Sequence, residues 1–252
     1  MESDDSNQTN KQAILRDLCN PIKPGSRILD LGCGNGKSVQ KWRDLGYPAF
    51  GCDIKFKDEN SPEVSSMLEE NIIRLIQPNP YLLPFENNSF DFIFSDQVFE
   101  HVQNYSETIS EINRILKPDG YCLHIFPSRY KIIESHTHVP FSSIIRSPAW
   151  LFLWAITGIR NKLQTGLTAK ETTRLNYDYL INKTNYLAKK QITLHFKQYF
   201  EEIIYCENLS LKHSRRGRWI YKLSNLLPYL PAIYATLRSR IIFTRLPKKI
   251  ST

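Results

Sequence analysis

The chain has 252 residues, 41% of them hydrophobic, and carries a formal net charge of +8 at pH 7. This length excludes two full domains and suits one sizeable domain with additions. The five cysteines include no C-x-x-C pair, and the acidic, polar N-terminus has no secretory signal, so a cytosolic protein with reduced thiols is expected.

The predicted elements begin with a disordered segment to about residue 10. A short helix follows over residues 11–19, with Ile14, Leu15 and Leu18 on one face, and is expected to cover the ligand cleft. Strands are then expected near residues 27–31, 48–53, 72–76, 90–95 and 120–126, with helices near 37–46, 62–70 and 105–116. This alternation predicts a parallel, doubly wound α/β sheet, in which ligands bind at the carboxyl ends of the strands.

Beyond residue 126 the regular alternation lapses. A largely helical insertion is expected over 128–190, a sixth strand at 201–206, a second helical insertion over about 210–237 and a last strand at 240–245. The predicted organisation has four parts: a tail with the lid helix (1–20), a ligand-binding core (21–127), a helical substrate lid (128–200), and the end of the core sheet with a basic, aromatic helical insertion (201–252).

Three glycines at alternate positions follow the first predicted strand: Gly32, Gly34 and Gly36. Glycine tolerates positive φ and has no Cβ, so backbone at such a turn can pass close to a nucleotide-like ligand. A nicotinamide fingerprint, G-x-G-x-x-G, would place its third glycine at position 37, where this chain has Lys37. Hydride chemistry is therefore disfavoured.

The pattern Asp30-x-Gly32-x-Gly34-x-Gly36 resembles the first motif of class I S-adenosylmethionine (SAM)-dependent methyltransferases, within the broad ubiquinone and menaquinone biosynthesis group. Residues 47–53, 83–95, 100–102 and 116–121 resemble later motifs of the same family in the same order. The resemblance implies a Rossmann-like fold: a seven-stranded, mostly parallel sheet with an antiparallel last strand and helical insertions. It also implies SAM as cofactor; a non-enzymatic α/β domain is the alternative.

The same resemblance implies a cofactor-binding set: Asp30, Gly32, Cys33, Gly34, Gly36, Asp53, Ile54, Asn79, Pro80, Asp96 and Gln97. In the family pattern, Asp30 would hold the methionine amino group, the backbone of residues 32–34 would meet the methionine portion, and Asp53 would bind the ribose. Asp96 and Gln97 would close the site at the end of the fourth strand.

The adenine end of this set is less regular. Ile54 would pack on the adenine face, although an ordinary core position is equally compatible with the sequence. Relatives often place an Asp where this chain has Asn79, whose side-chain carbonyl can still act as an acceptor. Pro80 has no N–H and cannot donate to the ring, so adenine binding is expected to differ in detail.

Methyl transfer from a sulfonium needs alignment of the reacting atoms and exclusion of water, and a hydroxyl acceptor also needs a base. The histidines near the predicted cleft are His101, His124, His136 and His138. His101 is the first choice because Glu100-His101 follows the fourth strand, and Asp96 lies one helical turn before Glu100. The resemblance to ubiquinone-pathway O-methyltransferases would allow a metal there, but a structural role for His101 is also open, and no metal site is assigned.

Residues 127–141 begin where the fifth strand ends and are expected to contact the substrate. They are similar to an N-R-Y…E-P-H-T-x-x-P-F stretch in bacterial methyltransferases of surface-glycan assembly, with Ser135 where Pro is usual. His136 and His138 are therefore candidate bases or sugar-binding groups. A polar loop entering a helix is the alternative, and H-x-H alone makes no zinc site.

The C-terminal segment, residues 209–252, contains ten Lys or Arg residues and no Asp or Glu, interleaved with Trp, Tyr and Leu. Such a mixture is typical of an interfacial helix that faces anionic lipid. The apolar run 148–159 is too short to span a bilayer but could dip into one; a helix buried against the sheet is the alternative. Peripheral contact with the inner face of the membrane is therefore predicted.

The sequence thus predicts a SAM-dependent methyltransferase, with O-methylation of a small, glycan or lipid-linked acceptor at the membrane surface. A nucleic-acid (RNA) methyltransferase is the chief rival because the basic segment would also suit nucleic acid. Against it, the fourth strand is followed by Asp96-Gln97-Val98-Phe99 and not by the Pro-Pro-Tyr motif of base amino-methyltransferases. A non-catalytic SAM-binding regulator at the membrane is the other alternative.

Overall fold

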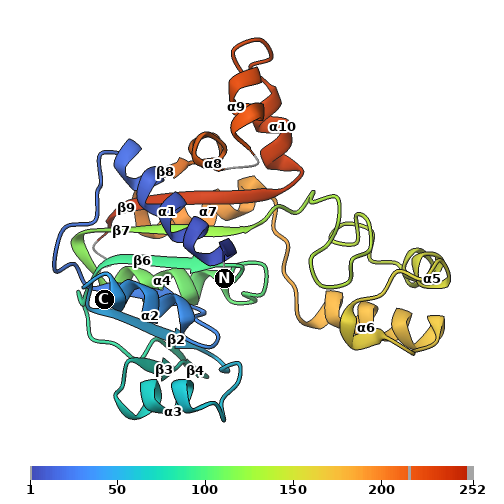
Figure 1. Cartoon of the computed structure of the whole chain (residues 1–252), viewed down its shortest axis with the longest axis horizontal. Coiled ribbons are helices and arrows are strands. Elements are labelled where there is room, and N and C mark those ends of the chain that lie inside the picture. Colours follow the sequence, from blue (N-terminus) through green and yellow to red (C-terminus); the bar gives the residue numbers. More distant parts are fainter. Residues whose placement is uncertain (1, 215–216, 249–252) are drawn as a thin grey trace.

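The computed structural model describes residues 2–214 and 217–248. Its central feature is a seven-stranded sheet in the order β3-β2-β1-β6-β7-β9-β8 (Figure 1). The strands are β1 (Ile28–Leu31), β2 (Ala49–Asp53), β3 (Ile73–Leu75), β6 (Phe90–Asp96), β7 (Leu116–Pro127), β8 (Phe200–Tyr205) and β9 (Ser239–Pro247). A separate small hairpin consists of β4 (Gln77–Pro78) and β5 (Tyr81–Leu82). The predicted strands are all present, and the Rossmann-like methyltransferase fold is confirmed.

Strand β1 pairs in parallel with both β2 and β6, and β6 pairs in parallel with β7. The strand order therefore reverses at the β1/β6 pair, which creates a crevice outside the carboxyl ends of these strands. Strand β9 is antiparallel to both β7 and β8, so the antiparallel last strand is also confirmed.

Both faces of the sheet are covered. On one face, α4 (Tyr105–Ile115) and α7 (Lys189–Tyr199) contribute Ile109 and Phe196 to an apolar cluster with Phe90 and Phe200. The other face is covered by α1 (Glu2–Asp17), α2 (Lys37–Asp44) and α3 (Pro62–Glu69). The core is thus complete within the sheet and its two helical layers, and the carboxyl ends of the strands remain available for a ligand.

Helix α1 corrects the expectation of disorder before residue 10, because it begins at Glu2. Ile14 and Leu15 are fully buried against the sheet, as their spacing predicts. At the end of the helix, the Asp17 carboxylate accepts hydrogen bonds of 2.8 Å from Lys212 and His213 of α8 (Glu207–His213). These partners lie about two hundred residues away in sequence, so local periodicity could not reveal the full length of the helix.

The first insertion forms a lobe beside the sheet (Figure 1). It contains α5 (Pro148–Ile156), a 3-10 turn (Lys162–Gln164) and α6 (Ala169–Asn182), packed around Val139, Leu151 and Leu180. Helix α5 thus packs on α6, which overturns the alternative that residues 148–159 are buried against the sheet. Helix α7, which follows the lobe, packs on α4 in the core layer.

The second insertion consists of α8, α9 (Arg218–Leu223) and α10 (Leu230–Thr236). Helices α9 and α10 form a hairpin that stands off the body (Figure 1). Of the basic residues in this part of the sequence, Arg215, Arg216 and Lys249 lie outside the described residues. Within the described chain, no helix combines the length and the apolar character needed to cross a bilayer.

Candidate active site

A cavity of about 820 Å³ occupies the crevice at the carboxyl ends of β1, β2 and β6. Gly32, Gly34, Asp53, Asp96 and Gln97 line one part of it. His101 and His136 line another part, together with Tyr179 of the lobe. A single cavity therefore joins the predicted cofactor residues to two of the predicted bases.

The glycine turn forms one wall of the cavity. Gly32 has a φ of 77°, and a Cβ atom there would lie only 2.3 Å from Cγ2 of Val98. Gly34, with a φ of 59°, also lines the cavity. Gly36 has a different role: it precedes α2 with a φ of 73°, and a Cβ would lie 2.6 Å from Cε of Met67. The first two glycines shape the ligand wall, whereas Gly36 permits the close packing of α2 and α3.

Asp53, at the end of β2, lines the cavity and also holds the turn together. Its Oδ2 accepts a 2.8 Å hydrogen bond from the Gly34 backbone N–H, and its Oδ1 accepts one of 2.7 Å from Ile54. A carboxylate oxygen has more than one lone pair, so these bonds leave capacity for ribose hydroxyls. Cys33, in the same turn, is buried and does not line the cavity.

The expected adenine end is only partly as predicted. Ile54 lines the cavity with 60% of its surface exposed, so the ordinary-core alternative for this residue is wrong. Asn79 and Pro80 form the exposed turn of the β4–β5 hairpin and do not line the cavity; the flanking Pro78 and Tyr81 do. The hairpin reverses direction between residues 78 and 81, which carries the two predicted residues away from the crevice.

Two buried ionisable side chains, Lys11 and Asp30, lie near the half-buried Asp96 behind the glycine turn. Lys11 of α1 is 2% exposed and forms an ion pair with Asp96, which lines the cavity. Asp30 is 5% exposed; burial, followed by the nearby Asp96 carboxylate, raises the pKa of Asp30 to about 8, against the opposing effect of Lys11. A bound ammonium group would favour ionisation of Asp30. Asp30 itself does not line the cavity, so its contact with the methionine amino group of SAM stays a prediction.

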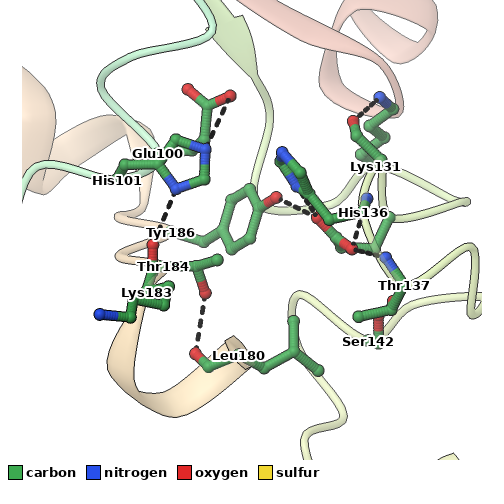
Figure 2. Close-up of polar contacts among 12 residues, drawn as sticks. Glu100, His101, Lys131, His136, Thr137, Ser142, Leu180, Lys183, Thr184 and Tyr186 are labelled. Carbon is green, nitrogen blue, oxygen red and sulfur yellow. Dashed lines mark hydrogen bonds and ion pairs between the residues drawn. The ribbon is translucent and has the colours of Figure 1, made fainter. Parts of the chain in front are cut away.

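His101 is held by the lobe. Its Nδ1 lies 2.7 Å from the backbone oxygen of Lys183 (Figure 2). A carbonyl oxygen only accepts hydrogen bonds, so Nδ1 carries the proton and Nε2 keeps its lone pair. Burial lowers the pKa of His101, which favours the neutral ring. The Glu100 carboxylate is 3.9 Å from Nε2, and the two oxygens of this buried group have no hydrogen-bond partner within the described residues. Burial raises the pKa of Glu100 to about 7.

His136 is oriented by a buried carboxylate, Glu134. The Nδ1 atom of His136 lies 2.9 Å from Oε1 of Glu134, and Tyr186 donates to the same oxygen at 2.7 Å (Figure 2). Thr137 donates its backbone N–H to the other oxygen at 2.6 Å. Burial alone would raise the pKa of Glu134, but the hydrogen bonds from His136, Thr137 and Tyr186 outweigh it and lower that pKa to about 2. The ionised Glu134 therefore accepts a hydrogen bond from Nδ1–H of His136, which leaves Nε2 as the basic atom, without a partner among the described residues.

The two rings that line the cavity lie close together. The ring centroids of His101 and His136 are 5.0 Å apart, and the Tyr179 ring lies 5.0 Å from His136, tilted by 42°. His138 is exposed outside the cavity, at a left-handed φ of 60° that departs from an extended backbone. His124 is fully buried in β7, bonded to Ser95 at 2.8 Å, and burial lowers its pKa to about 3. The structure thus brings together His101 and His136 and separates His138 and His124 from the site.

Sequence reasoning missed Lys11, Glu134, Tyr179 and Tyr186. For Lys11 a signal existed, because it lies one helical turn before Ile14 and Leu15 and so shares their buried face. Glu134 lies two residues before His136, within residues 127–141, which were expected to contact the substrate. Tyr179 and Tyr186 carried no signal. Within the described chain, no group of three or more His, Cys, Asp or Glu side chains has the arrangement to hold a metal ion.

Comparison with known proteins places this geometry in context. Residues 29–124 match a family model described as a methyltransferase domain. Among curated proteins, the chain is 29% identical over 106 residues to the sterol 24-C-methyltransferase of Schizosaccharomyces pombe, covering 39% of this chain and 27% of that protein. It is 28% identical over 119 residues to the demethylmenaquinone methyltransferase of Staphylococcus saprophyticus, covering 46% of this chain and 50% of that protein. The matched part thus spans half or less of these relatives.

Among solved structures, the fold is similar to phosphoethanolamine N-methyltransferase 2 of Haemonchus contortus, solved with phosphomonomethylethanolamine and S-adenosylhomocysteine. The TM-score is 0.51 at 17% identity, over 96% of this chain and 53% of that one. At this level of identity, the likeness concerns the fold.

The raised pKa of Asp30 predicts that the affinity for SAM rises with pH between about 6 and 8, by at most about tenfold per pH unit. Below pH 8 the ligand-free carboxyl is protonated, and it must lose that proton to pair with the ammonium of SAM. Calorimetry across this range checks the slope. Asp30→Asn, which mimics the protonated acid, should bind more weakly and without the slope; an affinity that is independent of pH in the native protein would contradict the prediction.

Proposed function

Residues 29–124 are a class I SAM-dependent methyltransferase domain, and we propose that the chain transfers the methyl group of SAM to an oxygen of a small, glycan or lipid-linked acceptor at a membrane surface. The Glu134–His136 pair beside the cofactor cavity supports oxygen as the atom that receives the methyl group. A hydroxyl must lose its proton as it attacks the methyl carbon, and a neutral imidazole fixed by a carboxylate is suited to accept it.

The roles follow from the contacts. Gly32, Gly34 and Asp53 would bind SAM, with Asp30 and Asp96 near its methionine end. His136 would accept the acceptor's proton at Nε2, and Glu134 is the positioning residue that stabilises the resulting imidazolium. The leaving group is already activated by its positive charge, so alignment of the hydroxyl with the methyl carbon supplies the rest of the catalysis. His101 and Tyr179 would form the adjacent wall around the acceptor.

An amphipathic acceptor is supported by the α9–α10 hairpin. Trp219, Leu226, Leu227 and Tyr229 expose 54–79% of their surfaces, next to Arg218 and Lys222 and without any acidic residue. Exposed apolar side chains flanked by cations favour insertion into the headgroup layer of an anionic bilayer. They are poorly suited to nucleic acid, which requires solvated cations along its phosphates. The two curated relatives are named for apolar acceptors, a sterol and demethylmenaquinone.

Calorimetry with SAM, S-adenosylhomocysteine and NAD tests the cofactor part of the proposal. The two sulfur compounds are expected to bind in the micromolar range and NAD not at all. Asp53→Ala should weaken SAM binding by about 2–4 kcal/mol, because two charge-assisted hydrogen bonds to the ribose are lost. Binding of NAD in place of SAM, or no binding of either, would sink the proposal.

Methyl transfer itself is measured with methyl-labelled SAM and a total cell lipid extract, by following label into the organic phase. His136→Gln is expected to lower this rate by about 10²- to 10⁴-fold with SAM affinity unchanged, since only proton removal is lost. Glu134→Gln should lower it in the same direction. His138→Gln changes the exposed histidine outside the cavity and should keep the rate; equal losses for both histidine variants would rule out the assignment of His136 as base.

Membrane contact is measured by co-sedimentation with vesicles of phosphatidylcholine alone or with phosphatidylglycerol. Binding is expected only with the anionic lipid and should weaken by about tenfold or more in Leu226→Ser/Leu227→Ser, because apolar area no longer enters the bilayer. Leu45→Ser, at a 56% exposed leucine after α2, is the matched control. If RNA competes the protein off the vesicles, or both variants bind alike, the hairpin is not the lipid contact.

A further inference from the structure

A second cavity, of about 460 Å³, lies beside the first and has no part in the roles described above. It is enclosed by α1, α8 and α10 and by the adjoining ends of β7 and β9. Gln97 lines both cavities, so the second space adjoins the cofactor site at the end of β6. A molecule that occupies the second cavity would therefore lie next to the cofactor cavity.

Two cations share its wall. Lys131 follows β7, and Arg238 lies between α10 and β9. Backbone hydrogen bonds from Ser128 N to Arg238 O, 3.2 Å, and from Ile132 N to Leu237 O, 3.3 Å, hold the two segments side by side. The juxtaposition of the two cations is thus built into the fold and does not depend on flexible side chains alone.

Neither cation has a carboxylate within salt-bridge distance among the described residues, although Glu134 and Glu100 act on Lys131 from farther away. Within the described chain, Lys131 donates to Ser135 at 2.5 Å and Arg238 donates to Tyr234, but neither forms a salt bridge. Burial lowers the pKa of Lys131, and Arg238 acts in the same direction, whereas Glu134 and Glu100 oppose it. Two like charges in one partly buried cavity repel each other, and an anion between them would relieve that repulsion.

The remaining polar lining suits an anion. Ser210, Ser214, Ser239 and Tyr234 supply hydroxyl groups. Asn10 donates to Ser210 at 3.2 Å, and the other atom of its amide is buried without a partner. Rotation of the amide places its NH₂ group at that position while the oxygen accepts from Ser210, so a further donor is available.

One acidic residue, Glu207, also lines the cavity. Its carboxylate pairs with Arg240 at 3.3 Å, and both residues are less than 10% exposed. Because Arg240 neutralises Glu207, the net charge of the cavity wall is set by Lys131 and Arg238 and is positive.

We infer that this second cavity binds a phosphate or diphosphate group of the methyl acceptor, between Lys131 and Arg238. The inference rests on the proposed function, because it is the adjoining SAM site that makes the occupant an acceptor. An acceptor held here by its anionic group would extend past Gln97 and present its hydroxyl to the cofactor cavity. The α9–α10 hairpin, which continues from the same walls, would keep an apolar chain of that acceptor at the membrane.

The test uses inorganic pyrophosphate as probe, titrated by calorimetry into the full-length protein saturated with S-adenosylhomocysteine. Lys131→Met and Arg238→Met remove one cation each and leave an unbranched apolar side chain. Each is expected to weaken pyrophosphate binding by about tenfold or more, because charge-assisted hydrogen bonds to the anion are lost. Lys222→Met, at an exposed cation of α9 outside the cavity, is the matched control and should bind like the native protein.

The affinity for S-adenosylhomocysteine, measured on every variant, separates the two hypotheses. If it is retained while pyrophosphate fails to bind, or binds equally to all variants, the anion site is wrong and the methyltransferase proposal stands. If S-adenosylhomocysteine does not bind even to the native protein, the proposed function fails instead. A loss in Lys222→Met as large as in Lys131→Met would show diffuse charge attraction and would also overturn the site.

A parallel series with phosphatidylglycerol vesicles distinguishes the source of the phosphate. Weaker vesicle binding in Lys131→Met than in the native protein supports the cavity as a site for a phospholipid headgroup. Unchanged vesicle binding, together with weaker pyrophosphate binding, supports it as a site for a phosphorylated acceptor that leaves the bilayer. Pyrophosphate should displace the protein from vesicles only in the first case.

Discussion

The reversal of strand order at the β1/β6 pair is the constraint on which the rest of this structure depends. With β2 on one side of β1 and β6 on the other, the chain crosses over in opposite directions, and no connection covers the carboxyl ends of these strands. Gly32, Asp53 and Asp96 meet there although they are far apart in sequence. The cofactor cavity is therefore a consequence of topology, and the glycine turn adapts its surface to a ligand.

The lobe completes the site from outside the sheet. Asn185 donates its backbone N–H to the backbone carbonyl of Glu100 at 2.6 Å and its side-chain N–H to the backbone carbonyl of Val102 at 2.8 Å, so the return segment is fixed to the loop after β6. Through this contact, His101 and the Glu134–His136 pair come to face one cavity. Glu134 is stable as a buried ion because four donors surround it, which makes the pair a rigid unit with one free basic atom.

Charge links the two cavities. Helix α1 supplies Lys11 to Asp96 in the first and Asn10 to the wall of the second, and it is anchored through Asp17 to α8. The N-terminal helix thus contributes to both spaces at once, while Gln97 separates them. This arrangement gives a physical basis for one acceptor contacting both: its anionic group would meet the cations, and its reactive oxygen would reach the neutral, partly buried end beside the histidines.

The sequence by itself determined the sheet, the glycine turn and the acid at the end of β2, because short apolar runs, closely spaced glycines and a polar residue at the end of a strand each leave a local pattern. It also restricted the base to a few histidines. Only the tertiary structure distinguishes these candidates: His136 and His138 are chemically alike and two residues apart, but His136 is bonded to Glu134 and lines the cavity, whereas His138 does not. The ion pair of Lys11 with Asp96 and the proximity of Lys131 and Arg238 likewise bring together segments about 85 to 110 residues apart. No local periodicity or spacing in the sequence predicts such contacts.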